Sequence, residues 1–168
     1  SDHILKLMSR RYNKDLYKNR IKFIKSILPD SGIGVDVIVG FPGEDDIHFQ
    51  ETYDFINEIN VSYLHVFSYS ERNNTKSVNL YPKVDPSIII NRSKVLHDLS
   101  EKKRTLFYLN NNGSMKNILI ESYEGGVLSG LTENYIKVKT MGKADEVNTL
   151  MPLQMEYVNE DEMWGKRI

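Results

Sequence analysis

The chain has 168 residues, 40% hydrophobic and 27% charged, a composition typical of a folded globular protein. Its net charge of −1 argues against a uniformly basic nucleic-acid binder, and the lack of cysteine excludes disulfides, cysteine nucleophiles and zinc or iron–sulfur sites ligated by its own thiolates. No apolar run approaches the roughly 20 residues of a membrane span and no signal peptide opens the sequence, so we expect a cytoplasmic protein without membrane contact.

Charge is distributed in blocks along the chain. Residues 1–30 are rich in Lys and Arg, whereas residues 31–60 contain acidic side chains but neither Lys nor Arg. Such blocks are usual for solvated helix faces. The functional alternative is a basic stripe, over residues 1–25 and 72–104, that faces a polyanion.

The first part of the chain predicts alternating helices and strands. Residues 14–28 carry apolar side chains at helical spacing, and residues 34–40 form a β-branched run typical of a buried strand. A second helix to about residue 59 and a second strand over 63–67 follow, an order that predicts a parallel α/β sheet. The residues that share one face of the first helix are Tyr17, Ile21, Ile24 and Leu28. The face of the second helix that we expect to be buried consists of Phe49, Tyr53, Ile56 and Ile59.

A polar loop over 68–85 precedes a long helix that starts at Pro86 and runs to about Leu109. The residues expected along one side of this helix are Leu96, Leu99, Lys103 and Leu106. The Asn-Asn-Asn-Gly run at 110–113 predicts the end of the helix and a domain boundary. We therefore expect two domains, residues 1–109 and residues 110–168.

The second predicted domain has strand periodicity. Residues 118–122, 135–139 and 153–157 are the predicted strands, and Gly-rich or polar turns separate them, including one at Ser129-Gly130. Short strands at this spacing predict a small β-barrel or sandwich.

Two segments that end the predicted parallel strands are candidate ligand sites. Residues 37–44 include Gly40 and Gly43, which allow close approach of the backbone and precede a helix N-terminus. Residues 65–72 combine aromatic and hydroxyl side chains with Arg72, which suits a carboxylate or phosphate. Ligands bind at the carboxyl ends of parallel strands. The simpler alternatives are a tight turn at the first segment and a solvated surface loop at the second.

Four segments resemble, in order and spacing, the motifs M-x-R-x-Y, D-x-I-V-G-F-P-G-E, F-P-Y-S-x-R-x-G-T and G-L-T-x-N-Y. They begin here at Met8, Asp36, Phe67 and Gly130. Together they resemble the radical SAM methylthiotransferases, and the last is similar to part of their C-terminal TRAM domain. The resemblance spans essentially the whole chain and favours the branch that acts on threonylcarbamoyladenosine in tRNA.

This resemblance implies an α/β fold, the C-terminal part of a radical SAM (β/α)₆ partial TIM barrel, followed by a small all-β TRAM-like barrel. Members of the family use two [4Fe–4S] clusters and S-adenosylmethionine to methylthiolate C2 of an adenosine beside the anticodon, with the TRAM domain helping to hold the tRNA anticodon stem-loop. Because this chain has no cysteine, the resemblance implies a fragment that lacks the cluster-binding N-terminal part of the same protein and is inactive alone.

The resemblance also implies site residues. Those at the S-adenosylmethionine rim are Val39, Gly40, Glu44, Phe67, Tyr69, Ser70 and Arg10. Those near substrate or RNA are Arg72, Lys137, Lys139 and Lys143, although the three lysines also suit a solvated strand edge. No catalytic residue or metal ligand is expected in this chain. Ser68 and Asn74 depart from the family's usual Pro and Gly.

Other functions remain open on the sequence alone. A methylthiotransferase for isopentenyladenosine in tRNA or for a ribosomal protein belongs to the same family. A non-catalytic RNA-binding module that works through residues 108–168 belongs to another class, as does an interaction scaffold built on a degenerate half-barrel. Cysteines upstream in the native gene product would indicate the enzyme.

Overall fold

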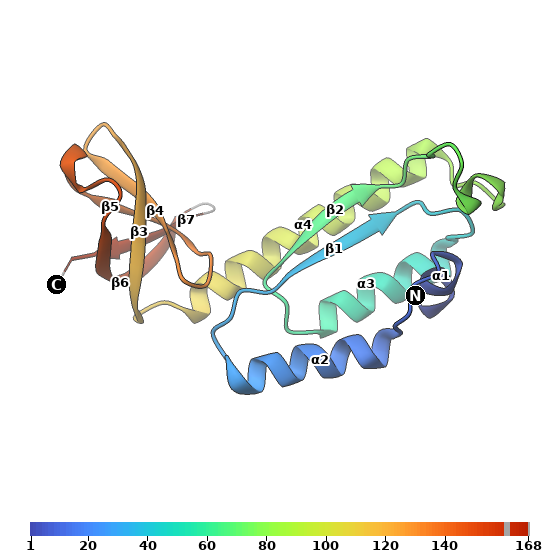
Figure 1. Cartoon of the computed structure of the whole chain (residues 1–168), viewed down its shortest axis with the longest axis horizontal. Helices are drawn as coiled ribbons and strands as arrows, with labels where there is room; N and C mark the ends of the chain where they lie inside the picture. Colours follow the sequence, from blue (N-terminus) through green and yellow to red (C-terminus); the bar gives the residue numbers. More distant parts are fainter. Residues whose placement is uncertain (160–161, 168) are drawn as a thin grey trace. The chain divides into compact units, whose positions relative to one another are not determined.

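The computed structural model describes residues 1–159 and 162–167 (Figure 1). It divides into two compact units, one of residues 1–29 and 33–102, the other of residues 30–32 and 103–168. No helix in the described part of the chain is long and apolar enough to cross a membrane.

The first unit contains the predicted helices and strands together with two short elements that the sequence pattern did not predict. Its elements are α1 (Asp2–Leu7), α2 (Lys14–Ile27), β1 (Gly34–Val39), α3 (Asp46–Glu58), β2 (Tyr63–Ser68), the 3₁₀ turn η1 (Lys76–Asn79) and the start of α4 (Pro86–Asn110). Side-chain caps begin two of the helices: Asn13 accepts a hydrogen bond from the Leu16 amide before α2, and Asp45 accepts one from the His48 amide before α3.

Strands β1 and β2 are parallel and in register, with Val37 opposite Val66 and Val39 opposite Ser68. One face of the pair packs on α2, α3 and α4 through a core of Ile21, Val35, Val37, Val39, Ile56, Ile59, Val61, Leu64, Leu96 and Leu99. Side chains on the other face are less buried, and Asp36, His65 and Phe67 among them are exposed. The predicted α/β arrangement is thus confirmed, with one sheet face covered by helices.

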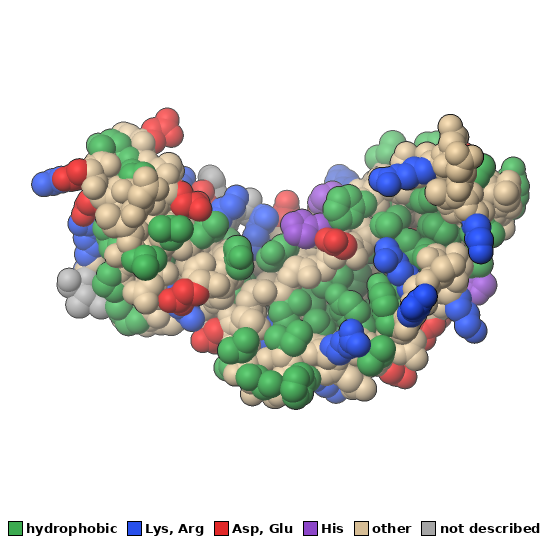
Figure 2. Space-filling model, viewed as in Figure 1, with side chains coloured by type: hydrophobic (Ala, Val, Ile, Leu, Met, Phe, Trp, Pro, Cys, Tyr) green, Lys and Arg blue, Asp and Glu red, His purple; other side chains and the backbone are tan. Residues whose placement is uncertain are grey.

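Two predicted helix faces are covered only in part. On α2, Ile21 is buried, but Ile24 is 38% exposed and Leu28 is 60% exposed. Figure 2 shows hydrophobic side chains gathered over the outer side of this helix, where Phe23 and Ile27 are also exposed.

On α4, Leu96 and Leu99 are buried, whereas Leu106, predicted along the same side of the helix, is 60% exposed. The helix changes its buried face because its last turns belong to the second unit, where Phe107 and Tyr108 enter the core instead.

The second unit is a closed barrel with the strand order β3-β4-β5-β7-β6 (Figure 1). Its elements are β3 (Met115–Glu124), β4 (Val127–Thr132), β5 (Lys137–Met141), the 3₁₀ turn η2 (Ala144–Glu146), β6 (Leu150–Asn159) and β7 (Glu162–Lys166). The fully buried core side chains include Ile118, Ile120, Leu128, Ile136, Leu153, Met155 and Met163. The barrel prediction is confirmed, whereas the predicted turn at Ser129-Gly130 is wrong because both residues lie inside β4.

Candidate functional site

The carboxyl ends of β1 and β2 bring the two candidate segments together. The Tyr69 amide donates to the Val39 carbonyl over 2.8 Å, and Phe67 lies opposite Ile38 in the strand register. The rings of Phe41 and Tyr69 contact edge to face, with centroids 5.2 Å apart. The predicted rim residues Val39, Gly40, Phe67, Tyr69 and Ser70 therefore lie at neighbouring strand ends of the first unit, although Val39 and Gly40 are buried.

Glu44 is buried at this rim and has its carboxylate engaged. Its Oε1 accepts a hydrogen bond from the Gly40 amide over 3.0 Å and forms an ion pair with Nη1 of Arg92 over 2.7 Å. Arg92, on α4, also donates from Nη1 to the Glu44 carbonyl and from Nη2 to Asp46 Oδ1. Its guanidinium carbon lies 5.2 Å from the centroid of the Phe49 ring. Glu44 thus fixes the turn between β1 and α3, with Arg92 as its partner.

The conformation of this turn depends on glycine. Gly40 has φ +77° and Gly43 has φ +89°, both in the left-handed region. A Cβ at Gly40 would also lie 2.4 Å from a side-chain carbon of Ile89. A side chain at Gly40 would therefore both strain the backbone and displace α4 from the rim.

The hydroxyl of Tyr69 is buried and has no hydrogen-bond partner among the described residues. Buried polar atoms are nearly always paired, so an orphaned hydroxyl at a strand end indicates a group that a ligand or water satisfies. Phe67 and Ser70 differ from it, because both side chains are exposed, Phe67 by 52%. The rim thus offers an exposed ring and a buried hydroxyl within four residues of chain.

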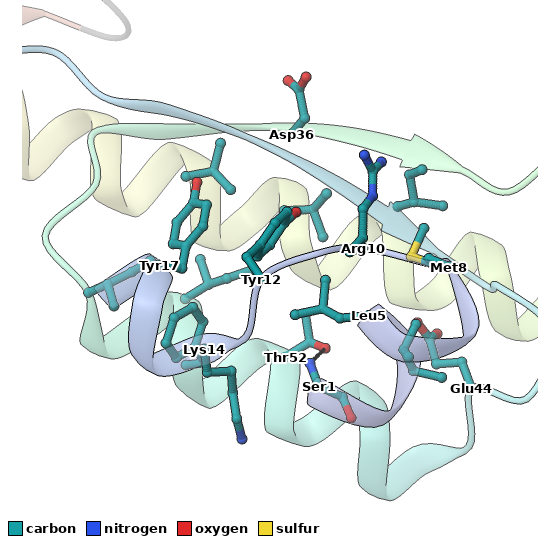
Figure 3. Close-up of a pocket in the computed structure, with 17 residues that line it drawn as sticks. Ser1, Leu5, Met8, Arg10, Tyr12, Lys14, Tyr17, Asp36, Glu44 and Thr52 are labelled. Carbon is teal, nitrogen blue, oxygen red and sulfur yellow. Dashed lines mark hydrogen bonds between the residues drawn. The ribbon is translucent and has the colours of Figure 1, made fainter. Parts of the chain in front are cut away.

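Arg10 is exposed and lines a cavity of about 120 Å³ between the N-terminal segment, β1 and α3. Figure 3 shows Arg10 and Tyr12 of that segment and Tyr17 of α2 directed towards β1, and Glu44 at one end of the group. Burial, followed by the influence of Tyr12 and Asp36, raises the pKa of Tyr17. Arg10 and Glu44 therefore border one cavity, although one lies before α2 and the other lies between β1 and α3.

Arg72 lies in the loop after β2, where its side chain is exposed and its backbone carbonyl accepts hydrogen bonds from the amide and hydroxyl of Thr75. Asn74, at the position of the usual family glycine, has φ +66°. Asparagine tolerates this region better than most residues, so the loop keeps a left-handed turn there.

The three barrel lysines do not form one uniform patch. Lys137 and Lys139 share the outer side of β5, and Lys139 forms an ion pair with Glu162 over 2.5 Å. Lys143 lies beyond the end of β5, where its backbone amide donates to Glu146. Two of the three predicted lysines therefore lie on one face, and one of those two is balanced by a carboxylate.

The segment that resembles G-L-T-x-N-Y forms the end of β4 and the turn into β5. Thr132 accepts a hydrogen bond from the Ile136 amide and contacts Asn134 through its hydroxyl. Asn134 donates to the carbonyl of Asp30 over 2.7 Å, and Tyr135 has φ +65°. Lys116 also pairs with Asp30, over 3.3 Å. The polar residues of the segment therefore build a turn and attach residues 30–32 to the barrel.

Sequence reasoning did not identify Arg92, because a lone arginine inside a long helical pattern resembles a solvated charge. Its spacing from buried Leu96 and Leu99 places it on the same helix face, which is the signal that points to burial. Among the described residues, no group of three or more histidines and carboxylates is placed to hold a metal ion.

The chain is similar in sequence to proteins that are named tRNA methylthiotransferases. The chain is 43% identical over 143 residues to the threonylcarbamoyladenosine tRNA methylthiotransferase MtaB of Aquifex aeolicus (strain VF5), a match that covers 84% of this chain and 34% of that protein. It is 32% identical over 160 residues to the MtaB of Bacillus subtilis (strain 168), covering 92% and 36%.

A second kind of relative is the tRNA-2-methylthio-N(6)-dimethylallyladenosine synthase of Syntrophus aciditrophicus (strain SB), which is 36% identical over 132 residues, covering 79% of this chain and 29% of that protein. No protein-family model matches the chain. The chain thus spans about a third of the length of the curated relatives that it matches.

Proposed function

Because this chain belongs to the tRNA methylthiotransferase family and matches the C-terminal part of its members, we propose that it is the corresponding part of a radical SAM enzyme that methylthiolates threonylcarbamoyladenosine beside the anticodon. The observation that carries the proposal is the continuous match to MtaB proteins, which includes both compact units. The Gly130–Tyr135 segment adds support, because it resembles the TRAM motif of that branch.

The proposal requires residues outside this chain. Two [4Fe–4S] clusters need thiolate ligands, and this sequence contains no cysteine. The missing N-terminal part of the same protein would supply them, so the chain alone is expected to be inactive as a methylthiotransferase. We expect the enzyme to work in the cytoplasm, with the anticodon stem-loop of tRNA as its partner.

The rim of the first unit has features that suit S-adenosylmethionine, the group that supplies a carbon radical and a methyl group in this family. Val39 and Gly40 lie at the end of β1, where the glycine has a left-handed φ, and the orphaned Tyr69 hydroxyl offers a hydrogen bond. Phe67 and Ser70 would contact the adenosine portion. Arg10 would bind the carboxylate of the methionine portion.

We assign Glu44 a positioning role within that site. Its Oε1 holds the Gly40 amide and the Arg92 guanidinium, so the carboxylate keeps the rim backbone in place. On the substrate side, Arg72 and the lysines at 137, 139 and 143 would contact RNA phosphate, and such contacts weaken as salt rises.

A second candidate substrate is dimethylallyladenosine, because synthases for the methylthio derivative of that nucleoside cover up to 100% of this chain at 29% identity. Both candidate substrates are nucleosides of tRNA. The sequence match favours threonylcarbamoyladenosine, because the chain is 43% identical to the Aquifex MtaB and 29% identical to the synthase that covers 100% of this chain.

Deleting the gene in its source cells and analysing tRNA nucleosides by mass spectrometry tests the proposal. Loss of the 2-methylthio form of threonylcarbamoyladenosine supports it. Loss of the 2-methylthio form of dimethylallyladenosine supports the second candidate instead. Unchanged levels of both, or a native gene product that lacks cysteine, would overturn the enzymatic reading.

A further inference from the structure

One face of the barrel combines two aromatic rings with lysine across three neighbouring strands. The register places Lys139 of β5 opposite Trp164 of β7, and Trp164 opposite Tyr157 of β6. The two rings are nearly parallel, with an interplanar angle of 5° and centroids 6.2 Å apart, and Tyr157 is 50% exposed. This row, which we call the aromatic row, is therefore a pair of stacked, partly exposed rings bordered by a cation.

A hollow of about 510 Å³ adjoins the aromatic row, and its lining includes Met141, Glu156, Tyr157, Trp164, Lys166 and Arg167. The cations around it are balanced by carboxylates. Lys139 pairs with Glu162 over 2.5 Å, Lys166 lies 3.9 Å from Glu156, and Arg167 pairs with Glu146 over 2.7 Å. Attraction for phosphate alone is therefore weak here, and the rings are the feature that distinguishes this face.

Charged side chains border both rings, which argues against a protein partner. The centre of a protein interface is depleted in Lys and Glu, whereas Lys166, Glu156 and Glu162 lie next to the aromatic row. An aromatic ring with a nearby cation is the usual platform for an unpaired base of RNA, because every base has a π-face and needs no particular donor pattern.

We propose that Tyr157 and Trp164 form a stacking platform for an unpaired base of RNA, with Lys139 and Lys166 at its edge. This inference rests on the proposed function, in which the barrel helps to hold an anticodon stem-loop. It adds that the loop bases, rather than the paired stem, contact this face. Stacking accounts for RNA contact by a unit whose charge is net acidic.

The chain contains one tryptophan, so Trp164 reports on its own surroundings. An RNA stem-loop titrated into the whole chain should quench the fluorescence of Trp164, whereas a fully paired duplex with the same stem sequence should not. Tyr157→Leu keeps the reporter and should weaken stem-loop binding by about tenfold, the effect of losing one base stack. The matched control is Tyr123→Leu, a substitution at a 41% exposed tyrosine on β3, a strand that does not pair with β7.

Fluorescence anisotropy of labelled RNA gives the affinity independently of the tryptophan signal. Equal affinities for the Tyr157→Leu and Tyr123→Leu variants, or equal quenching by stem-loop and duplex, would overturn the inference. A change in self-association on sedimentation, without a change in RNA affinity, would assign the face to protein contact and also overturn it. The proposed function fails separately, through unchanged tRNA nucleosides in the deletion strain.

Discussion

The guanidinium of Arg92 holds three groups at the start of α3: the carboxylate of Glu44, the carbonyl of Glu44 and the carboxylate of Asp46. The side chains of Arg92 and Glu44 are only 5% and 3% exposed, so this is an ion pair away from water. Removal of one partner from such a pair strongly lowers the free energy of unfolding, because it leaves a buried charge unpaired.

Arg92→Met should therefore destabilise the first unit by about 3–5 kcal/mol, because it leaves the Glu44 carboxylate buried without its cation. Urea unfolding of the chain measures the loss. Lys94→Met, at an exposed position of the same helix, is the control and should change stability little. Adding Glu44→Gln to Arg92→Met should recover part of the loss; no recovery would mean that the charge is not the cause.

Glu146 in the barrel is the residue for which we predict a measurable pH effect. Its hydrogen bonds from Arg167 and from the Lys143 amide lower its pKa from an ordinary 4.5 to about 2. A lowered pKa in the folded state contributes stability above the ordinary value, and that stability is lost as pH falls through the folded value. Thermal midpoints should therefore fall between pH 4.5 and pH 2 more steeply for the wild type than for Glu146→Gln.

The control for this effect is Glu121→Gln, at an exposed carboxylate on β3. Its acid profile should follow that of the wild type. Parallel profiles for the wild type and Glu146→Gln would show that the bidentate pair with Arg167 does not contribute to barrel stability.

At the scale of elements, the sequence predicted those whose periodicity is undisturbed. Strands β1 and β2 are short β-branched or apolar runs, and α2, α3 and α4 have apolar residues at helical spacing, so all five were found. The short helix α1 was not, because six residues give too little periodicity.

The sequence predicted a turn at Ser129-Gly130, inside β4, because of the glycine. Gly130 is there for a different reason: a Cβ at that position would lie 2.1 Å from the carbonyl oxygen of Leu119 on β3. The sequence alone does not distinguish a glycine that allows close approach of two backbones from a glycine that makes a turn. The candidate site shows the same limit, since strand ends can be located from the pattern but the pairing of Glu44 with Arg92 depends on tertiary structure.

Gly130→Ala should destabilise the barrel by about 1–3 kcal/mol, because a methyl group would collide with backbone that cannot rotate away. Ser129→Ala, at the neighbouring position of β4, is the matched control. Differential scanning calorimetry of both variants gives the comparison. If both lose equal stability, the close contact with Leu119 is not the reason for the glycine.

At the scale of the whole molecule, the two-stranded sheet is an unusual feature. Parallel sheets are generally covered on both faces, yet here Asp36, His65 and Phe67 remain exposed on one. We expect the purified chain to associate through this surface as its concentration rises. Phe67→Ser should shift light-scattering masses towards the monomer, whereas Phe23→Ser, an equally apolar change on α2, should not. A monomer at all concentrations would contradict the expectation.

The three residues at 30–32 also limit how the two units can be exchanged between relatives. The chain leaves the first unit after α2, contributes this segment to the barrel and returns at Ile33, so the barrel is discontinuous in sequence. A recombination event with one crossover in α4 would join a barrel to a foreign segment at 30–32. The ion pair of Lys116 would then lose its carboxylate where another residue stands at position 30. The hydrogen bond of Asn134 would depend on the foreign backbone placing its carbonyl at the same point. We therefore expect the barrel of a relative to be exchanged together with its own segment at 30–32, rather than as an independent domain.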